Sequence, residues 1–490
     1  MVFIGWRGTR ILSSMTQAVR IEHDLIGDRQ VPAAAYYGVH TLRALENFPI
    51  TGTPISIYPY LIEALACVKQ AAAIANCELG LLDGERADAI VHACEEIRGG
   101  ALLQEFVVDV IQGGAGTSTN MNANEVIANR ALELLGAKKG DYARLHPLDH
   151  VNLSQSTNDV YPTAVKLALQ FGIRRLLGEM AGLRKEFEAK AAEFSDVLKI
   201  GRTQLQDAVP MTLGQEFSTY AVMLQEDESR LGEAGGLARE INLGATAIGT
   251  GINAHPEYAQ RVTRILSEIT LVEFVVSPNL IEATQDAGAF VQLSGVLKRV
   301  AVKLSKVCND LRLLSSGPRA GFGEINLPAV QAGSSIMPGK VNPVIPEVVN
   351  QVAFEVIGND ITVTMAAEGG QLQLNAFEPI IAHSLFKSIS HLAAACRTLA
   401  ERCVRGITAN REHARLLLDN STALVTALNP YIGYARSGEI AREALATGRR
   451  VYDLVLEKKL MTREDLDALL RPEVLTQPHF STIPRPKVDP

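Results

Sequence analysis

Aromatic side chains are scarce in this sequence. Phe, Trp and Tyr make up 5% of its 490 residues, whereas apolar residues of all kinds make up 47%. The apolar content therefore comes mainly from alanine and aliphatic residues, which suit long packed helices better than a β-sandwich or a β-barrel. A chain of this length exceeds the size at which one hydrophobic core usually stops growing, so we expect two or three domains.

The sequence has neither an excess of positive charge nor a long apolar run. Its formal net charge is −7, which argues against a general affinity for nucleic acid or for anionic membranes. No stretch of about 18 uncharged apolar residues occurs, which is the length that a membrane span needs. We therefore expect no nucleic-acid partner and no association with a membrane.

Cysteine is rare and irregularly spaced. The six cysteines show no CxxC spacing, so they indicate buried thiols in a reducing, cytoplasmic compartment and not a disulfide framework. Cys396 and Cys403 lie seven residues apart, on one face of an expected helix, and no histidine stands at ligand spacing beside them. Core thiols explain this pair better than a metal site does.

Three common catalytic motifs are also missing. Residues 244–251 are glycine-rich but lack the lysine of a GxxxxGK[ST] phosphate loop. His146 and His150 are four residues apart, but no HExxH pattern exists and Pro147 would break a helix across them, which argues against a zinc site. No GxSxG elbow occurs, so a serine hydrolase is not favoured either.

The first twenty residues differ from the rest. They contain Arg7, Arg10 and Arg20, several Ser and Thr residues and no acidic residue, which is similar to an organellar transit peptide. The alternative is an upstream start codon, with Met15 as the second start. We favour the alternative because the segment lacks a convincing amphipathic repeat, and we expect a disordered leader over residues 1–20.

Helical periodicity dominates the remaining sequence. Apolar residues recur at three- and four-residue spacing in 61–75, 87–97 and 125–135, and then over five much longer segments. These five segments cover roughly 163–194, 212–242, 287–314, 344–367 and 377–405. They predict a mainly all-α protein with an elongated five-helix bundle. Several of the segments are apolar over more than one face, so we expect the chain to self-associate.

The periodic segments suggest three domains after the leader. Residues 21–156 would form an N-terminal helical domain, and residues 157–411 the central long-helix bundle. Residues 412–490 would form a small C-terminal helical domain, because the helical segments there are short and charged and are followed by a proline-rich tail.

Four polar stretches separate the helical segments: 113–124, 152–159, 201–216 and 333–343. Polar loops carried on rigid helices are where binding and catalysis concentrate. The first stretch places glycines and hydroxyl groups before a helix, which suits a carboxylate or a phosphate, although a capped helix entry would look the same. The second could hold a small dicarboxylic acid, or it could only cap a helix that opens at Pro162.

Residues 333–343 read Gly-Ser-Ser-Ile-Met-Pro-Gly-Lys-Val-Asn-Pro. The glycines permit mobility and the prolines restrict it, so we expect this loop to close as a lid. Lys340 offers a cation for a carboxylate, and Asn342 offers hydrogen bonds. Ser334 and Ser335 are candidates for a base or for oxyanion stabilisation. The alternative is a mobile surface loop with a solvated lysine.

In this order, and separated by long helices, the four stretches resemble those of the aspartase/fumarase superfamily. The resemblance runs from about Ile21 to about Leu470, and the 333–343 motif is its most specific part. The chain is more similar to the aspartase branch than to fumarases, which usually carry histidine where Gln204 stands. The other aspartase-like features are Ala115, Thr157, Leu205, Leu313–Pro328 and Thr364–Pro379.

The resemblance implies a three-domain, mostly helical subunit in a homotetramer whose active sites combine loops of three subunits. It implies that Ser334 removes the C3 proton of L-aspartate, that ammonia leaves from C2, and that fumarate forms. It also implies a set of substrate-binding residues, to which Arg43 is added on a shorter motif. The set is Thr117, Ser156, Thr157, Asn158, Thr203, Gln204, Ser335, Lys340 and Asn342. No cofactor is expected to be required, and a divalent cation such as Mg²⁺ is expected at most as an activator.

Three positions depart from the family pattern. Leu153 stands where relatives often have lysine. Leu148 replaces the asparagine of a His-Pro-Asn-Asp motif that is tied to a second carboxylate site in fumarases, so we expect no such site. Gln204 removes a histidine that relatives pair with the residue equivalent to Glu347. Either proton transfer to the leaving group takes another route, or the departure of ammonia is assisted differently.

Two other functions stay open on the sequence alone. A fumarate hydratase would use the same loops on malate. A structural protein could retain the helical fold without catalysis, since a fold does not ensure a function. The presence of Ser334, Lys340 and Asn342 argues against this second alternative.

Overall fold

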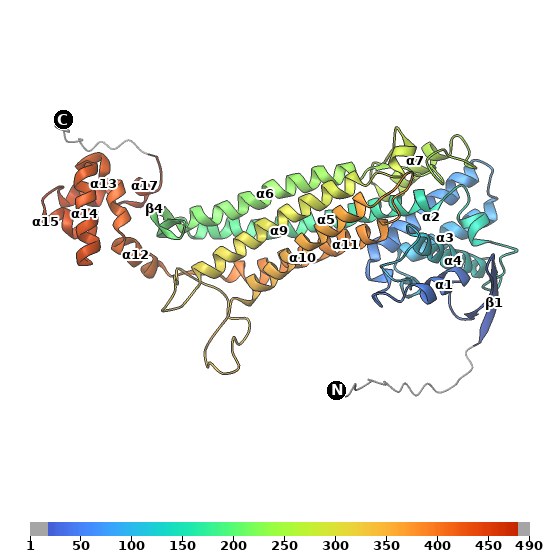
Figure 1. Cartoon of the computed structure of the whole chain (residues 1–490), viewed down its shortest axis with the longest axis horizontal. Helices are drawn as coiled ribbons and strands as arrows, with labels where there is room; N and C mark the ends of the chain where they lie inside the picture. Colours follow the sequence, from blue (N-terminus) through green and yellow to red (C-terminus); the bar gives the residue numbers. More distant parts are fainter. Residues whose placement is uncertain (1–17, 479–490) are drawn as a thin grey trace. The chain divides into compact units, whose positions relative to one another are not determined.

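The computed structural model of the chain describes residues 18–478, which form two compact units (Figure 1). Unit 1 contains the chain up to Phe171 together with residues 236–291 and 362–386, and unit 2 contains the rest. The helices α5, α6, α9, α10 and α11 contribute residues to both units. Most of the expected leader lies outside the described residues, and strand β1 begins at Val19. The expected three-domain division stays a prediction.

Unit 1 is built from helices and two small sheets. Strands β1 (Val19–Asp24) and β2 (Gly27–Pro32) form an antiparallel hairpin, and β5 (Glu240–Ile241) pairs in parallel with β6 (Val275–Val276). The helices of this unit are α1 (Val39–Asn47), α2 (Pro59–Glu78), α3 (Gly84–Arg98), α4 (Thr117–Leu134), α7 (Tyr258–Thr270), α8 (Leu280–Ala283) and the start of α5 (Thr157–Glu193). Helix α2 is alanine-rich and buried on almost every side, against α3 and α7, so it is the central helix of this core.

Unit 2 contains most of the long helices. These are the remainder of α5, α6 (Leu213–Leu237), α9 (Gly288–Leu314), α10 (Val344–Glu368) and α11 (Glu378–Arg402). Strands β3 (Leu198–Thr203) and β4 (Gln206–Thr212) form a hairpin, and β7 (Ile325–Asn326) pairs with β8 (Thr408–Ala409). The chain then continues through α12 (Arg411–Asn420), α13 (Val425–Ile432), α14 (Tyr434–Thr447), α15 (Val451–Glu457), α16 (Arg463–Leu469) and α17 (Pro472–Leu475).

Ion pairs join the long helices of unit 2 in a closed ring. They link α5 to α6, α6 to α9, α9 to α10, α10 to α11 and α11 back to α5. The pairs are Arg184–Glu228, Lys303–Asp227, Lys298–Asp360, Lys387–Glu355 and Arg397–Glu179. Apolar side chains fill the interior, and on α9 they recur with the helical period at Leu293, Leu297, Val300, Leu304, Val307 and Leu311.

The structure confirms the mainly helical class and the five long helices. The largest difference in position is at the start of α5, which was expected to open after Pro162 but begins at Thr157, with Pro162 inside it. A proline in a helix leaves the carbonyl four residues earlier without its N–H partner. That carbonyl belongs to Asn158, and the side-chain amide of Asn242 donates to it at 3.0 Å. The replacement hydrogen bond allows the helix to start one turn earlier.

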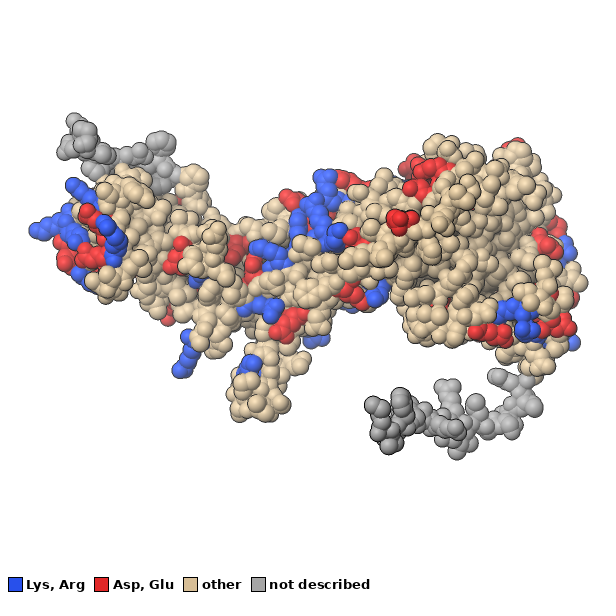
Figure 2. All heavy atoms as spheres, viewed as in Figure 1, with Lys and Arg blue, Asp and Glu red and all other residues tan. Residues whose placement is uncertain are grey.

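The described surface agrees with the balanced charge of the sequence. Figure 2 shows Lys and Arg interspersed with Asp and Glu on the visible face. None of the helices within residues 18–478 combines the length and the apolar character needed to cross a membrane. Helix α10 exposes large apolar side chains, since Phe354, Ile361 and Met365 are 62%, 59% and 69% exposed.

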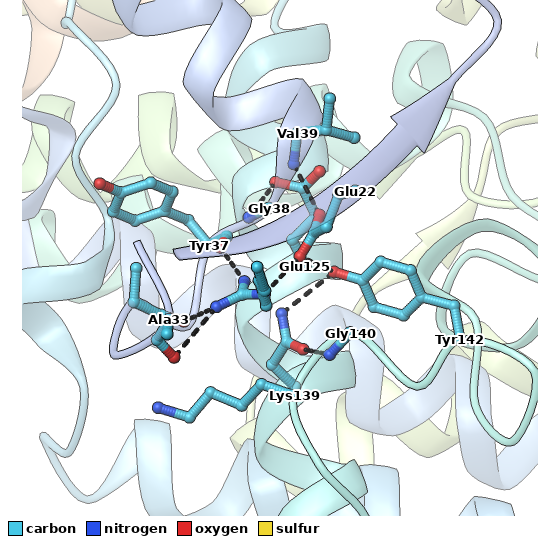
Figure 3. A network of polar contacts seen from close by, with 12 residues as sticks. Glu22, Ala33, Tyr37, Gly38, Val39, Glu125, Lys139, Gly140 and Tyr142 are labelled. Atoms are coloured by element: carbon cyan, nitrogen blue, oxygen red, sulfur yellow. Dashed lines mark hydrogen bonds and ion pairs between the residues drawn. The ribbon is translucent and has the colours of Figure 1, made fainter. Parts of the chain in front are cut away.

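Two buried carboxylates cap the start of α1 (Figure 3). Glu125 accepts hydrogen bonds from three N–H groups and from the Thr41 hydroxyl, at 2.6–3.1 Å. Glu22 accepts from the N–H group of Val39 at 2.8 Å. The first N–H groups of a helix lack partners within the helix, so carboxylates there satisfy them and interact favourably with the helix dipole. Burial, and to a smaller extent the neighbouring Glu22, raises the pKa of Glu125 to about 7.

The first prediction concerns this cap. Glu125→Gln replaces one of the two acceptor oxygens with an amide NH2 group, which cannot accept from the N–H donors of α1. The free energy of unfolding should therefore fall by about 2 kcal/mol. The pKa of Glu125 is raised in the folded state, so its stabilising contribution is complete below about pH 4.5 and is lost as the pH rises through about 7. A glutamine does not titrate. Denaturant unfolding at pH 5 and pH 8 should therefore show a smaller difference between wild type and variant at pH 8, and a difference that widens with pH would contradict the account.

Candidate active site

The N-terminal ends of α4 and α5 meet in unit 1. The side-chain amide of Asn120, on α4, donates to the Thr157 hydroxyl, the first residue of α5, at 3.1 Å. Helix α4 begins with Thr117 directly after Gly116, which has a φ of +91°. A Cβ atom at Gly116 would lie 2.4 Å from the ring of Tyr161, so only glycine fits there. Helix N-termini attract anions, and each of these two helices begins with a threonine. The Thr117 hydroxyl donates to the carbonyl of Gly114 at 2.7 Å in this structure.

Ser156 and Asp159 form a reciprocal cap at the start of α5. The Ser156 hydroxyl accepts from the N–H of Asn158 at 3.3 Å, and Asp159 accepts from the N–H of Ser156 at 2.9 Å. Asp159 also accepts from the N–H groups of Gly244 and Thr246, and burial raises its pKa to about 6. The capping alternative is therefore observed, one turn before Pro162. It is compatible with binding, because a hydroxyl that accepts one bond keeps its hydrogen for a ligand.

Asn158 is held with a defined orientation. Its amide nitrogen donates to the carbonyl of Ala247 at 2.7 Å. The amide oxygen is therefore left to accept from a ligand, such as a substrate ammonium group.

Arg43 is engaged within the N-terminal part of unit 1. Its guanidinium forms two hydrogen bonds with Asp24, at 2.7 and 2.8 Å, and a third with the carbonyl of Gly27. The bond from Arg43 lowers the pKa of Asp24 to about 2. Arg43 also lines a cavity of about 500 Å³ with His146 and Leu148. In this structure its guanidinium holds the β1–β2 hairpin to α1, and its expected role in substrate handling stays a prediction.

Thr203 and Gln204 lie at the tip of the β3–β4 hairpin in unit 2. Thr203 pairs with Gln206, and the two turn residues, Gln204 and Leu205, have φ values of +54° and +62°. Positive φ at both positions is typical of the tight turns that connect twisted strands. All four residues are exposed.

A buried carboxylate anchors this hairpin. Glu324 is 0% exposed and forms ion pairs with Arg202 at 2.7 Å and with Lys199 at 2.9 Å. Arg202 directly precedes Thr203 and stacks on the ring of Phe322, with 4.1 Å to its centre. The strand that ends at Thr203 is therefore fixed to the segment that follows α9.

The 333–343 loop lies between β7 and α10, in the connection that follows α9 (Figure 1). Two hydrogen bonds close its neck. The N–H of Gly333 donates to the carbonyl of Lys340 at 2.8 Å, and the side-chain amide of Asn342 donates to the carbonyl of Gly333 at 2.6 Å. A Cβ atom at Gly333 would lie 2.5 Å from the Lys340 carbonyl oxygen, so the neck requires glycine. The Lys340 side chain is exposed and forms no ion pair with any residue in 18–478.

The hydroxyl oxygen of Ser334 accepts two hydrogen bonds within this loop. The donors are the N–H groups of Ile336, at 3.2 Å, and Met337, at 2.9 Å. Hydrogen bonds to a charged form favour that form. Two N–H donors therefore stabilise a Ser334 alkoxide, which is the form that could act as a base. Ser335 is exposed beside it.

The expected site residues thus form two groups, one in each unit. Unit 1 carries Arg43, Thr117, Ser156, Thr157 and Asn158, whereas unit 2 carries Thr203, Gln204, Ser334, Ser335, Lys340 and Asn342. The structure brings Thr117 and Thr157 to neighbouring helix ends. No hydrogen bond among the described residues joins the hairpin tip of unit 2 to the 333–343 loop. Within residues 18–478, no cluster of three or more His, Cys, Asp or Glu side chains could hold a metal ion.

The buried residues that contact the unit 1 group were not predicted from the sequence. Lys69 is completely buried on α2, and its ammonium donates to the side-chain oxygens of Asn152 and Gln155, each at 2.9 Å. Burial lowers the pKa of Lys69 to about 7, against the opposing effect of the Asp159 carboxylate. The available signal was a lysine in the middle of the most apolar helical segment, because a charge there needs polar partners.

Known proteins resemble the chain over nearly its full length. The profile of a family described as Lyase matches residues 27–358, and one described as Fumarase C C-terminus matches residues 424–477. An aspartate ammonia-lyase of Helicobacter pylori is 59% identical over 94% of this chain and 98% of its own. The structure of a Brucella melitensis protein described as fumarate lyase:delta crystallin, with bound cobalt, is 57% identical, with a TM-score of 0.92 over 94% of this chain and 100% of that one. A class II fumarase from Schistosoma mansoni is 36% identical, with a TM-score of 0.89 and the same coverage.

The second prediction concerns the loop before Thr117. Gly116→Ala forces a methyl group against Tyr161 and should displace Thr117, so we expect kcat/KM of the enzyme to fall about 10- to 100-fold. Gly136→Ala is the matched control at the other end of α4. It has a similar positive φ, +72°, but open space around a Cβ atom. Steady-state kinetics of both variants check this, and equal activity of the two would rule out the steric role of Gly116.

Proposed function

We propose that this chain, which belongs to the aspartase/fumarase superfamily of lyases, is a carbon–nitrogen lyase that converts L-aspartate into fumarate and ammonia. One observation supports L-aspartate over malate as the substrate. The chain is 59% identical to an aspartate ammonia-lyase over 94% of its length, but 36% identical to a fumarase. The superfamily and the reaction class expected from the sequence are thereby confirmed.

Ser334 is the base that removes the C3 proton. A serine hydroxyl is normally far too weak an acid to be ionised, so its alkoxide needs stabilisation in a site that excludes water. The N–H groups of Ile336 and Met337 already point at its oxygen, and the cation of Lys340 lies on the same loop. Closure of the 333–343 loop over the substrate would complete this environment.

The carbanion formed at C3 places a second negative charge on the neighbouring carboxylate. Stabilising this charge is the main task of the site, because a proton next to an ionised carboxylate is very hard to remove. Hydroxyl groups at helix N-termini are suited to it, since they add hydrogen bonds to a favourable dipole. We assign this task to Thr117, Ser156, Thr157 and Ser335. Lys340, Asn342 and Thr203 hold the other carboxylate.

The nature of Gln204 fits an amine leaving group. Glutamine does not titrate, so it cannot protonate a departing hydroxide as an acid would. The ammonium of L-aspartate needs no acid, because the C–N bond breaks with its electron pair on nitrogen and neutral ammonia leaves. The oxygen of Asn158, left to accept by the bond to Ala247, is placed to hold that ammonium. Malate would need an acid at this position.

We further propose a homotetramer whose active sites are shared between subunits. The exposed apolar side chains of α10, such as Phe354 and Ile361, support self-association, because isolated soluble proteins rarely expose such a face. The proposal requires no cofactor, since hydroxyl and N–H groups perform each step. Mg²⁺ stays a predicted activator, and a cytoplasmic location stays a prediction from the cysteine pattern.

The third prediction tests the substrate. The purified protein should form fumarate from L-aspartate, followed by the ultraviolet absorbance of fumarate, and should form L-aspartate from fumarate and ammonia. Malate should give no fumarate above background. Consumption of malate without any formation of aspartate would replace this proposal by fumarate hydratase, and no activity on either substrate would favour a structural protein.

The fourth prediction tests the base. Ser334→Ala should lower kcat by about a thousandfold or more, because it removes the proposed base. Ser335→Ala is the matched control beside it, and it should lower kcat by about a hundredfold, as expected for loss of one oxyanion donor. Size-exclusion chromatography should show the wild-type assembly for both variants. Near-normal activity of Ser334→Ala would refute the assigned base.

A further inference from the structure

A chain of buried side-chain hydrogen bonds leads from Lys69 to Thr157. The Lys69 ammonium donates to Asn152 Oδ1 at 2.9 Å, and Asn120 Nδ2 donates to the same oxygen at 3.1 Å. Asn120 Nδ2 also donates to Thr157 Oγ1 at 3.1 Å. Lys69 and Asn120 are 0% and 1% exposed, so water does not compete for these bonds. Neither Lys69, Asn120 nor Asn152 has a part in the mechanism above.

The first member of this chain fixes the direction of every bond in it. The charged form of Lys69 can only donate, and its neutral form still carries two hydrogens, so Lys69 donates to the side-chain oxygens of both Asn152 and Gln155. The oxygen of Asn152 in turn requires the amino group of Asn120, and also that of Asn124, which donates at 3.1 Å. The amides of Asn120 and Asn124 adopt this orientation even though their own buried oxygens find no partner within residues 18–478.

The last member determines what the Thr157 hydroxyl can do. Its oxygen already accepts from Asn120, and no acceptor for its hydrogen is found among the described residues. The hydroxyl therefore remains a donor at the N-terminus of α5, where a substrate carboxylate is proposed to bind. If the amide of Asn120 were reversed, its oxygen would accept the Thr157 hydrogen and the donor would be lost.

We propose that Asn120 is a positioning residue that, oriented by Lys69 through Asn152, keeps the Thr157 hydroxyl as a hydrogen-bond donor to the substrate carboxylate. This inference rests on the proposed lyase function and deepens it. The need for the donor is greatest when the second negative charge develops on the carboxylate. Loss of the orientation should therefore reduce kcat more than it raises KM.

Asn120→Asp is the direct test, because it keeps the shape of the side chain but replaces the amino group with an acceptor oxygen. The Thr157 hydroxyl should then donate to the new carboxylate, and kcat should fall about a hundredfold with KM changed less than about threefold. Thr157→Val removes the same donor and should cost a similar factor. The double variant should be at most about threefold slower than the slower single variant, because both changes remove one interaction.

Asn122→Asp is the matched control on the same helix. Asn122 is 0% exposed and bonds to the backbone of Glu105 and Val107, with no path to Thr157. When Asn122→Asp is combined with Thr157→Val, the fold-loss of kcat should equal the product of the two single fold-losses, as expected for independent sites. If Asn120 had a purely structural role, the fold-losses of kcat in Asn120→Asp and Thr157→Val would also multiply in their double variant. The inference is overturned if Asn120→Asp keeps the wild-type kcat. It is also overturned if the fold-loss of kcat in the double variant equals the product of the two single fold-losses.

Asn120→Leu keeps the inference testable if Asn120→Asp does not fold. It frees the Thr157 hydroxyl without reversing it, so kcat should fall about tenfold, and this loss should disappear in the Thr157→Val background. A tenfold loss that persists in that background overturns the inference. The activity of the wild-type enzyme distinguishes failure of the proposed function from failure of the role proposed for Asn120. If it does not act on L-aspartate, the proposed function fails and the inference with it, whereas an active wild type with multiplicative losses overturns the inference alone.

Discussion

The buried ammonium of Lys69 is the charge around which unit 1 is arranged. Placing a charge inside a helical core is costly unless polar groups surround it. Here the oxygens of Asn152 and Gln155 lie at 2.9 Å, and the Asp159 carboxylate counters the charge from the start of α5. Each of these partners belongs to the polar loop before α5 or to its first turn, and Asn120 adds α4 to the same network. Accommodating one lysine therefore brings together the two helix ends that carry the hydroxyl groups.

Unit 2 uses a buried charge of opposite sign for the same purpose. Glu324, fully buried, binds Lys199 and Arg202 and so fixes the strand that ends at Thr203. The 333–343 loop instead depends on its own backbone, which closes the neck and aims two N–H groups at Ser334. Both solutions hold small polar segments at the ends of long apolar helices. The helices supply stability, and the ionic and backbone contacts supply the orientation that catalysis requires.

The sequence predicted the helices well because their signal is long and periodic, as on α9, where buried residues recur with the helical period. It misplaced the start of α5, because the hydrogen bond from Asn242 that tolerates Pro162 comes from a distant segment. The short hairpins also escaped notice, since a tight turn such as Gln204–Leu205 leaves little pattern. The candidate site residues were predicted from a motif resemblance. Lys69, Asn120 and Asn152 were not, because their roles follow from burial and from mutual contacts that spacing does not reveal.

We propose one active site in which the polar groups of unit 1 and those of unit 2 come from different subunits. Mixed refolding of two impaired variants tests it most directly, with Thr157→Val impaired in unit 1 and Ser334→Ala impaired in unit 2. Some sites in mixed tetramers would combine an intact Thr157 from one chain with an intact Ser334 from another. The account predicts that the mixture regains lyase activity well above the sum of the two variants refolded separately. Activity that stays at that sum would contradict it.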